Sequence, residues 1–192
     1  MTKYGVLNKL RKSVTPSANT VAILVLPVNN RDHIQGSETA TTTLVEYGDY
    51  QCSRCAEMHQ IIQNIQQQLG ERLRFVFRHF PCRKLHPYSQ KAAETAEAAA
   101  SQGQFWEMHD CLFRSQPVLD NSSLVECAVK VDLDISQFLQ ELSEGIHADR
   151  VECNLDSGVQ SGVKDTPTFF INGLQYEGAY EQSLLLAAII NV

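Results

Sequence analysis

The chain has 192 residues, of which 43% are hydrophobic and 20% are charged, a composition typical of a globular domain. Its formal net charge is −6. Without a basic stripe to offset the repulsion of phosphates, we expect no nucleic-acid partner. No apolar run approaches the ~20 residues that a membrane span needs, so we expect no membrane association. The length fits one domain, or one domain with a sizeable insertion.

The N-terminal segment bears on the cellular compartment of the protein. Residues 1–20 are polar and aperiodic, which predicts a flexible N-terminal arm, and residues 21–28 are interpreted as the first strand. No secretory signal is visible, and the irregular cysteine spacing does not resemble a disulfide framework, so the sequence favours a cytoplasmic protein. Residues 1–31 are basic, contain several Ser and Thr and lack acidic residues. That composition also suits an organelle transit peptide, which is the alternative location.

A β-α-β unit follows the first strand. Residues 29–42 form a polar connector, and residues 43–47 are apolar and predict a central strand. From Cys52 or Ser53 to Gly70, apolar residues recur at steps of three and four, which predicts a helix. Residues 72–80 alternate in character as a strand does. This order favours parallel pairing of the two strands with a right-handed crossover.

The second half begins with helices and returns to strands. Residues 87–159 show helical periodicity throughout, with Pro87 expected at a first helical position. Residues 166–171 predict a strand that opens with proline. Asn172-Gly173 is a strong hairpin signal before a returning strand at residues 174–177. A final helix is expected at residues 180–190.

The motif Cys52-Ser53-Arg54-Cys55 lies between the central strand and the following helix. The thiolate is the reactive form of cysteine, and the free N–H groups and dipole of a helix N-terminus stabilise it. Arg54 adds a cation, so Cys52 is predicted to be the attacking sulfur and Cys55 the resolving one. Glu46 precedes Cys52 by six residues, at a strand position that can point under the pair. A buried carboxylate there would take and return the Cys55 proton.

A single C-x-x-C can also be half of a zinc site. The nearest further ligands in sequence, Cys82 and His86, lie beyond a strand and are poor partners. His79, His86 and His109 lack the i, i+4 pattern of a metal-binding helix. We therefore favour redox chemistry over zinc binding and expect no metal and no bound cofactor besides the redox pair.

The remaining cysteines carry weaker signals. Cys82 is interpreted as a small buried residue at a strand end, with a third redox thiol as the alternative. Cys127 shares a helical face with apolar residues and is expected in the core, whereas Cys153 is expected to be exposed. A Cys127–Cys153 bridge is a further alternative without support from spacing. Cys111 receives no assigned role.

The order of elements resembles the thioredoxin fold, and more closely the DsbA-like thiol–disulfide oxidoreductases, over residues 21–192. The most specific segments are Glu46 to Cys55 and Thr166 to Gly173. Other similar segments are Asp32 to Gly36, Arg78 to Pro81 with His86-Pro87, and Gly103 to Asp110. The resemblance implies an α/β thioredoxin-like domain at residues 21–86 and 160–192, with an inserted all-helical domain at residues 87–159.

The resemblance also implies roles for individual residues. Cys52 would be the nucleophile, Cys55 the resolving thiol and Glu46 the buried acid. Thr166-Pro167 would hold a cis peptide bond beside Cys52, exposing the Thr166 backbone to an extended substrate strand, while Pro167 presents no N–H. Many relatives have proline after the first cysteine where this chain has Ser53, and neither Arg54 nor Cys82 is a common occupant of its position.

Taken together, the sequence predicts an enzyme that exchanges disulfides with protein substrates through a mixed disulfide at Cys52. Its partners would be protein thiols or disulfides and a thiol electron donor or acceptor. The alternative is a redox-sensing, protein-binding module of the same fold that works without turnover. A zinc-binding or purely structural relative is the third hypothesis. The sequence leaves the direction of exchange and the oligomeric state open.

Overall fold

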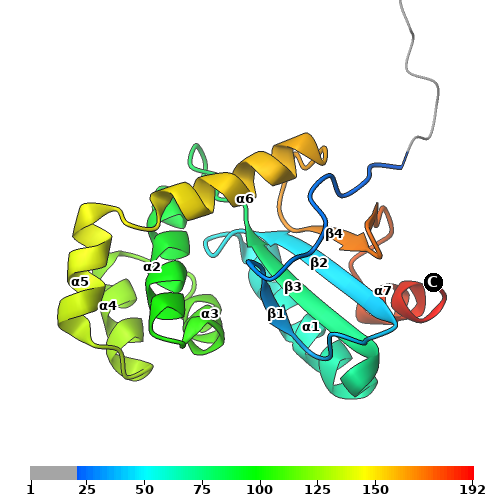
Figure 1. Cartoon of the computed structure of the whole chain (residues 1–192), viewed down its shortest axis with the longest axis horizontal. Coiled ribbons are helices and arrows are strands. Elements are labelled where there is room, and N and C mark those ends of the chain that lie inside the picture. The colour runs from blue at the N-terminus through cyan, green and yellow to red at the C-terminus, as the bar shows by residue number, and fades with distance from the viewer. Residues whose placement is uncertain (1–20) are drawn as a thin grey trace, which may run out of the picture.

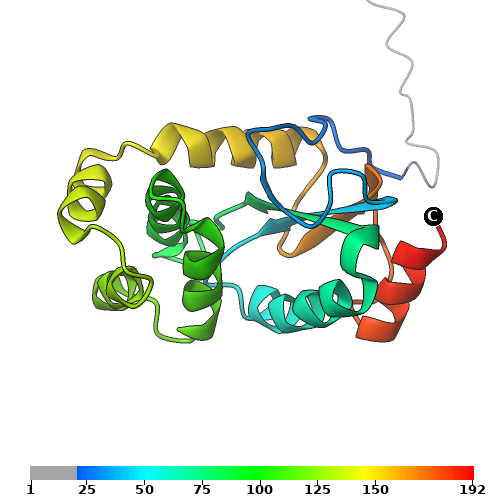
Figure 2. The ribbon, with the colours of Figure 1, turned by 60° about the horizontal axis from the view of Figure 1, so that its bottom comes forward.

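The computed structural model of the protein describes residues 21–192, which form one mixed β-sheet with helices on both faces (Figures 1 and 2). The strands are β1 (His33–Gln35), β2 (Thr42–Gly48), β3 (Leu73–His79), β4 (Thr168–Ile171) and β5 (Leu174–Gln175). The helices are α1 (Ser53–Leu69), α2 (Ser89–Ser101), α3 (Phe105–Arg114), α4 (Asn121–Lys130), α5 (Ile135–Glu144), α6 (Ala148–Gln160) and α7 (Gln182–Ile190). A short 3-10 turn, η1 (Gly70–Arg72), links α1 to β3.

The sheet has the order β1-β3-β2-β4-β5, which puts β2 in the centre. β2 and β3 run parallel and are joined by α1, as the β-α-β pattern predicts, whereas β4 is antiparallel to β2. α1 and α7 lie on one face of the sheet, and α6 crosses the other (Figure 2). This is the arrangement of a thioredoxin fold, so the predicted fold class is confirmed.

The first strand is not where the sequence predicts it. Residues 21–28 form no strand and meet the sheet through an isolated bridge between Ile23 and Leu174. Because β5 is only two residues long, it offers no edge along which a longer ladder could form. The first strand is instead β1, which lies within the predicted connector and pairs antiparallel with β3.

The helices α2 to α6 lie between β3 and β4, where the resemblance implies an inserted domain at residues 87–159. α2 begins at Ser89 rather than at Pro87, because Pro87 and Tyr88 belong to a turn. α6 extends from the other helices back across the sheet (Figure 1), so part of the insertion also covers the sheet. The domain boundaries stay a prediction, and the expected arm at residues 1–20 lies outside the described residues.

Polar contacts hold α6 against the sheet. The hydroxyl groups of Tyr47 and Ser157 lie 2.9 Å apart, and the main-chain N–H of His79 donates to the side-chain oxygen of Asn154 at 3.0 Å. All four residues are buried. Since an unpaired buried polar group costs about 1–3 kcal/mol, these contacts fix where α6 crosses the strands.

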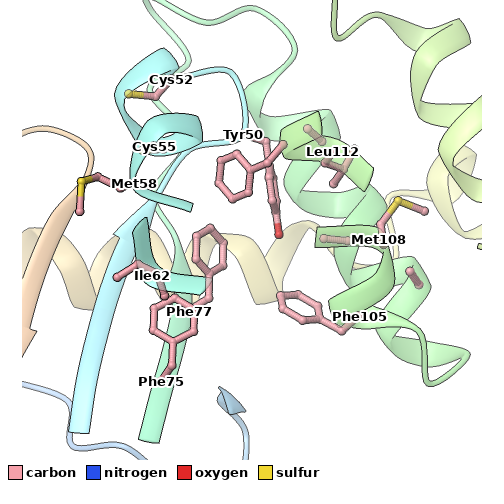
Figure 3. Packing of buried hydrophobic residues seen from close by; sticks show 14 of the residues in the cluster. Tyr50, Cys52, Cys55, Met58, Ile62, Phe75, Phe77, Phe105, Met108 and Leu112 are labelled. Atoms are coloured by element: carbon pink, nitrogen blue, oxygen red, sulfur yellow. The ribbon is translucent and has the colours of Figure 1, made fainter. Parts of the chain in front are cut away.

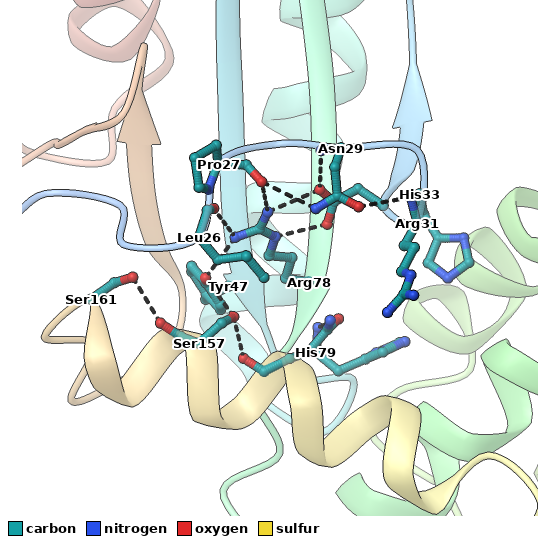
Figure 4. Close-up of polar contacts among 12 residues, drawn as sticks. Leu26, Pro27, Asn29, Arg31, His33, Tyr47, Arg78, His79, Ser157 and Ser161 are labelled. Carbon is teal, nitrogen blue, oxygen red and sulfur yellow. Dashed lines mark hydrogen bonds and ion pairs between the residues drawn. The ribbon is translucent and has the colours of Figure 1, made fainter.

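Arg78 is the largest polar side chain under this face, and it is fully buried. Its guanidinium donates to both carboxylate oxygens of Asp32, at 2.8 and 2.9 Å, and to the Tyr47 hydroxyl at 2.9 Å (Figure 4). It also donates to the main-chain carbonyls of Leu26 and Pro27. A buried cation is tolerated only when it is paired and hydrogen-bonded. Arg78 therefore ties the segment before β1 to the centre of the sheet.

The larger hydrophobic core lies between the sheet, α1, α7 and the helices α2 to α5, and Figure 3 shows part of it. Tyr50 and Phe77 pack in the space between α1 and α3, with ring centroids 5.4 Å apart, and both are buried. Because Tyr50 precedes Cys52 by two residues, this packing anchors the loop that carries the cysteines. Among residues 21–192, no helix combines the length and the apolar character needed to cross a membrane.

Candidate active site

The two cysteines of the motif lie at the start of α1 (Figure 3). Cys52 is the N-cap residue, with an extended backbone, and the helix begins at Ser53. Cys55 lies one turn inside the helix and is fully buried. Since the first-turn N–H groups of a helix lack intrahelical partners, they are available to an anion at Cys52. The sequence and the structure therefore place the pair in the same position.

The Cys52 sulfur contacts the loop that precedes β4. In its protonated form, the Cys52 thiol donates a hydrogen bond to the main-chain carbonyl oxygen of Thr166, with the sulfur and oxygen 3.3 Å apart. The Thr166–Pro167 peptide bond is cis. The structure thus brings together the two residues that the sequence assigns to substrate binding and the predicted nucleophile.

Several hydrogen bonds stabilise the charged form of Cys52. The Cys55 thiol donates the strongest of them, and the pKa of Cys52 is lowered to about 5 although the burial of Cys52 acts in the opposite direction. The main-chain N–H groups of Cys55 and Arg54 and a contact with Thr166 contribute as well. Cys52 is therefore a thiolate at neutral pH, the form in which cysteine attacks disulfides.

Cys55 and Glu46 lie in surroundings that favour their uncharged forms. Burial raises the pKa of Cys55 well above its ordinary value, and its hydrogen bond to Cys52 adds to the shift. Burial also raises the pKa of Glu46 to about 8, with the negative charge of Cys52 as the second cause. One carboxyl oxygen of Glu46 is buried without a hydrogen-bond partner within residues 21–192. This acid can hold or release a proton near neutral pH beside Cys55.

Gly48 leaves the space that Glu46 occupies. A Cβ atom at Gly48 would lie 2.4 Å from the Phe77 ring and 3.0 Å from a carboxyl oxygen of Glu46. Both distances are shorter than ordinary van der Waals contacts, so a larger residue would displace the acid or the aromatic ring.

The Arg54 side chain points to a different partner from the one that the sequence predicts. Its guanidinium lies over the ring of Tyr180, 5.5 Å from the ring centroid, where a cation is attracted to the aromatic face. The Tyr180 hydroxyl donates to the main-chain carbonyl of Pro167 at 2.9 Å. Arg54 therefore stabilises the thiolate of Cys52 through its main-chain N–H, while its charge is directed toward the Pro167 loop.

Asp49 organises the loop before Cys52, and the sequence analysis missed it. Its carboxylate accepts hydrogen bonds from the main-chain N–H groups of Gln51 and Cys82, both at 2.8 Å. It also contacts a ring nitrogen of His86 at 2.7 Å. An acidic residue directly after a buried strand was the available signal, since a short acidic side chain there can cap the turn.

Gln116, from the inserted helices, is a second residue that the sequence analysis missed. Its amide donates to the main-chain carbonyls of Tyr50 and Cys52, so the segment after α3 holds the active-site loop. No pattern in the sequence marks this contact, because it joins residues 64 and 66 positions apart.

The other cysteines differ in part from expectation. Cys127 is buried as predicted but is bonded to Cys111, and Cys153 is free and exposed, so the alternative Cys127–Cys153 bridge is wrong. Packing of α3 against α4 brings Cys111 and Cys127 together, whereas Cys153 lies on α6. Cys82 is half-buried, 3.8 Å from the Thr166 hydroxyl, and burial raises the pKa of its thiol. It is a weaker nucleophile than Cys52 at neutral pH.

One cluster within residues 21–192 has the composition of a metal site: His33, His79 and Glu97. Both imidazole rings contact the same carboxylate oxygen, at 2.9 and 3.0 Å, and a nitrogen of Arg150 lies 3.5 Å from it. Burial raises the pKa of Glu97, but hydrogen bonds from the two histidines outweigh burial and lower it. Because Arg150 already supplies a positive charge, we interpret the cluster as a hydrogen-bond network that joins the sheet to α2 and α6.

Comparison with known proteins places this geometry in a family. A family model described as Thioredoxin matches residues 28–191, and the chain belongs to that family. The solved structure of BdbD from Bacillus subtilis is similar, with a TM-score of 0.78, 22% identity and coverage of 89% of this chain and 97% of BdbD. A thioredoxin-like oxidoreductase from Silicibacter pomeroyi has a TM-score of 0.73 and 25% identity, with coverage of 84% of this chain and 92% of that one. The chain is thus a member of the Thioredoxin family, and its fold is similar to those of BdbD and the Silicibacter pomeroyi oxidoreductase.

Several curated relatives with similar sequences are named as antiporters rather than as oxidoreductases. The protein named Na(+)/H(+) antiporter NhaA 3 from Salinispora tropica is 40% identical over 169 residues, which cover 88% of this chain. The protein named Na(+)/H(+) antiporter NhaA from Herminiimonas arsenicoxydans is 37% identical over 174 residues, or 90% of this chain. The matches cover 26% and 28% of those proteins, so this chain spans about a quarter of their length.

The lowered pKa of Cys52 makes a testable prediction. We expect the rate of Cys52 alkylation by iodoacetamide to rise with pH through a midpoint near 5 in the reduced protein. Mass spectrometry of the Cys52 peptide measures this rate, with Cys52→Ser as the control for alkylation elsewhere. A midpoint near the ordinary cysteine value of about 8.5 would contradict the assigned environment.

Proposed function

We propose that this protein exchanges disulfides with other proteins through Cys52 and Cys55. The observation that carries the proposal is the pair of thiols whose pKa values are shifted in opposite directions, beside a buried acid. An attacking thiol needs to be charged, and a resolving thiol needs a group that accepts its proton. The DsbA-like fold supports the same class of reaction.

In the oxidative direction, a substrate thiolate attacks the Cys52 sulfur, and the Cys52–Cys55 bond breaks. Cys55 leaves as a thiolate and takes a proton from Glu46. A second substrate thiolate then attacks the substrate sulfur of the mixed disulfide and expels the Cys52 thiolate. The substrate loses two electrons and the protein gains them, and the same steps in reverse reduce a substrate disulfide. No cofactor beyond the cysteine pair is needed.

Thr166 and Pro167 would align the substrate for this exchange. The Thr166 backbone lies beside the Cys52 sulfur and offers main-chain groups to an extended peptide. Pro167 has no N–H and so places no competing donor there. The partners would be protein thiols or disulfides, together with a thiol that returns or removes the electrons.

The low pKa of Cys52 favours work as a disulfide donor, because it stabilises the reduced form. The cytoplasmic location expected from the sequence stays a prediction. Two features argue against it: the lowered pKa of Cys52 stabilises the reduced form of the pair, and Cys111 and Cys127 are paired. Structural disulfides are typical of oxidising compartments.

The first test is the reduction potential of the Cys52–Cys55 couple in glutathione buffers. We expect a reversible two-electron couple that is more oxidising than the ~−270 mV of thioredoxin. The Cys55→Ser variant should accumulate mixed disulfides between Cys52 and a model protein thiol, detected by mass spectrometry. Cys153→Ser is the matched control, since Cys153 is exposed and outside the site. Absence of both the couple and the trapped adduct would refute the proposal.

Glu46→Gln tests the proton transfer. We expect resolution of a Cys52 mixed disulfide by Cys55 to slow about 100-fold at pH 7, because the proton acceptor is lost. In the unaltered protein this rate should rise as Glu46 ionises, through about pH 8, and the variant should lack that rise. Rapid mixing followed by acid quench measures the rate, and Glu107→Gln, on the exposed side of α3, is the control.

A stability measurement separates this role from misfolding. A buried carboxyl whose pKa is raised destabilises the fold increasingly from its unfolded value of 4.5 up to about 8. Glu46→Gln should therefore keep or raise the melting temperature at pH 7. A slow variant with a lowered melting temperature would count against the proton-transfer role.

A second candidate is a redox-sensing module that binds a partner without turnover. It is favoured by the relatives named Na(+)/H(+) antiporters, in which the matching part is about a quarter of the protein. The partner in this case would be such an antiporter, and the Cys52–Cys55 pair would switch the binding. If Cys52→Ser still binds an antiporter and produces the same cellular effect, this candidate replaces the enzyme. Binding of an antiporter by Cys52→Ser without the cellular effect supports exchange chemistry.

A further inference from the structure

A charged pocket lies beside the reactive sulfur, and the proposed exchange does not use its charges. It has a volume of about 470 Å³ and is lined in part by Thr166 and Pro167. The Thr166 carbonyl is the atom that contacts the Cys52 sulfur, at 3.3 Å. A small molecule joined to Cys52 therefore has this pocket within its reach.

The walls carry charges of both signs. Arg54 and Lys164 supply two cations, and Asp165 and Glu177 supply two carboxylates, all of them exposed. Within residues 21–192, none of the four side chains forms an ion pair within 4.0 Å or donates or accepts a side-chain hydrogen bond. Contact with the Tyr180 ring orients Arg54 without neutralising it.

We propose that this pocket binds a low-molecular-weight thiol that carries both carboxylate and ammonium groups, of which glutathione is the probe. Arg54 and Lys164 would pair with its carboxylates, and Asp165 or Glu177 with its ammonium group. Such a zwitterion matches the two signs of charge, whereas a uniformly acidic or basic ligand would meet repulsion on one wall. This inference rests on the proposed exchange function and names one of its electron partners.

The chemistry balances without a further reactant. The Cys52 thiolate attacks glutathione disulfide, a Cys52–glutathione bond forms, and one glutathione thiolate leaves. Cys55 passes its proton to Glu46 and attacks Cys52, which releases the second glutathione thiolate and forms the Cys52–Cys55 disulfide. Two electrons pass from the protein to glutathione disulfide, and two glutathione thiols reverse the reaction.

The test compares two small disulfides on the full chain. The rate constant for oxidation of the reduced protein is measured with glutathione disulfide and with uncharged hydroxyethyl disulfide, and their ratio reports recognition of charge. We expect Lys164→Gln to lower this ratio about two- to fivefold, the effect of one exposed ion pair. Lys130→Gln, on α4 and outside the pocket, should leave the ratio unchanged. Raising the ionic strength should lower the ratio for the unaltered protein, because salt screens exposed charges.

Reversing the charge of Lys164 makes the test more stringent. Lys164→Glu should lower the ratio further, and it should raise the rate constant with the cationic disulfide cystamine relative to hydroxyethyl disulfide. A ratio that responds to neither Lys164 variant nor to salt would overturn the pocket assignment while leaving the exchange function intact. If neither glutathione disulfide nor hydroxyethyl disulfide oxidises the Cys52–Cys55 pair, the exchange function itself fails.

Discussion

The contact between the Cys52 sulfur and the Thr166 carbonyl joins residues 114 positions apart, and the candidate site depends on it. The sheet register produces this contact. β4 lies antiparallel to β2, with Thr168 opposite Tyr47, so the chain before Thr168 continues past the end of β2 toward the start of α1. Since both ends of this contact are anchored in adjacent central strands, the helices between β3 and β4 can form a large separate layer without displacing it.

The surroundings of the two thiols shift their pKa values in opposite directions. Cys52 is at the helix start, where N–H groups and the Cys55 thiol donate to its charged form, and these hydrogen bonds outweigh the effect of its burial on its pKa. Cys55 and Glu46 are enclosed by apolar residues, and for them desolvation is the leading effect. A displacement of three residues along one helix thus separates a charged nucleophile from a protonated resolving thiol. The same arrangement gives the buried acid a pKa near the pH at which it must exchange a proton.

Much of the fold could be predicted because its signals are local. Periodicity located α1, and the alternation of β3 and the Asn172-Gly173 turn located two further features. The error at residues 21–28 arose because a short apolar run indicates a suitable strand but not a partner edge, and β5 is too short to be one. The Cys111–Cys127 pair, the Gln116 contacts and the cluster around Glu97 depend on how separate helices pack. No spacing along the chain encodes that packing.

The orientation of Arg54 also could not be predicted from its position in the sequence, and it has a chemical consequence. Sequence proximity places its charge next to Cys52, but the aromatic face of Tyr180 draws the guanidinium toward the Pro167 loop. The thiolate is then stabilised by Cys55 and by main-chain groups, which every residue type except proline provides. The side chains of the charged pocket are consequently not required to activate the sulfur. Their identities can determine which partner approaches Cys52 while the chemistry at the sulfur stays the same.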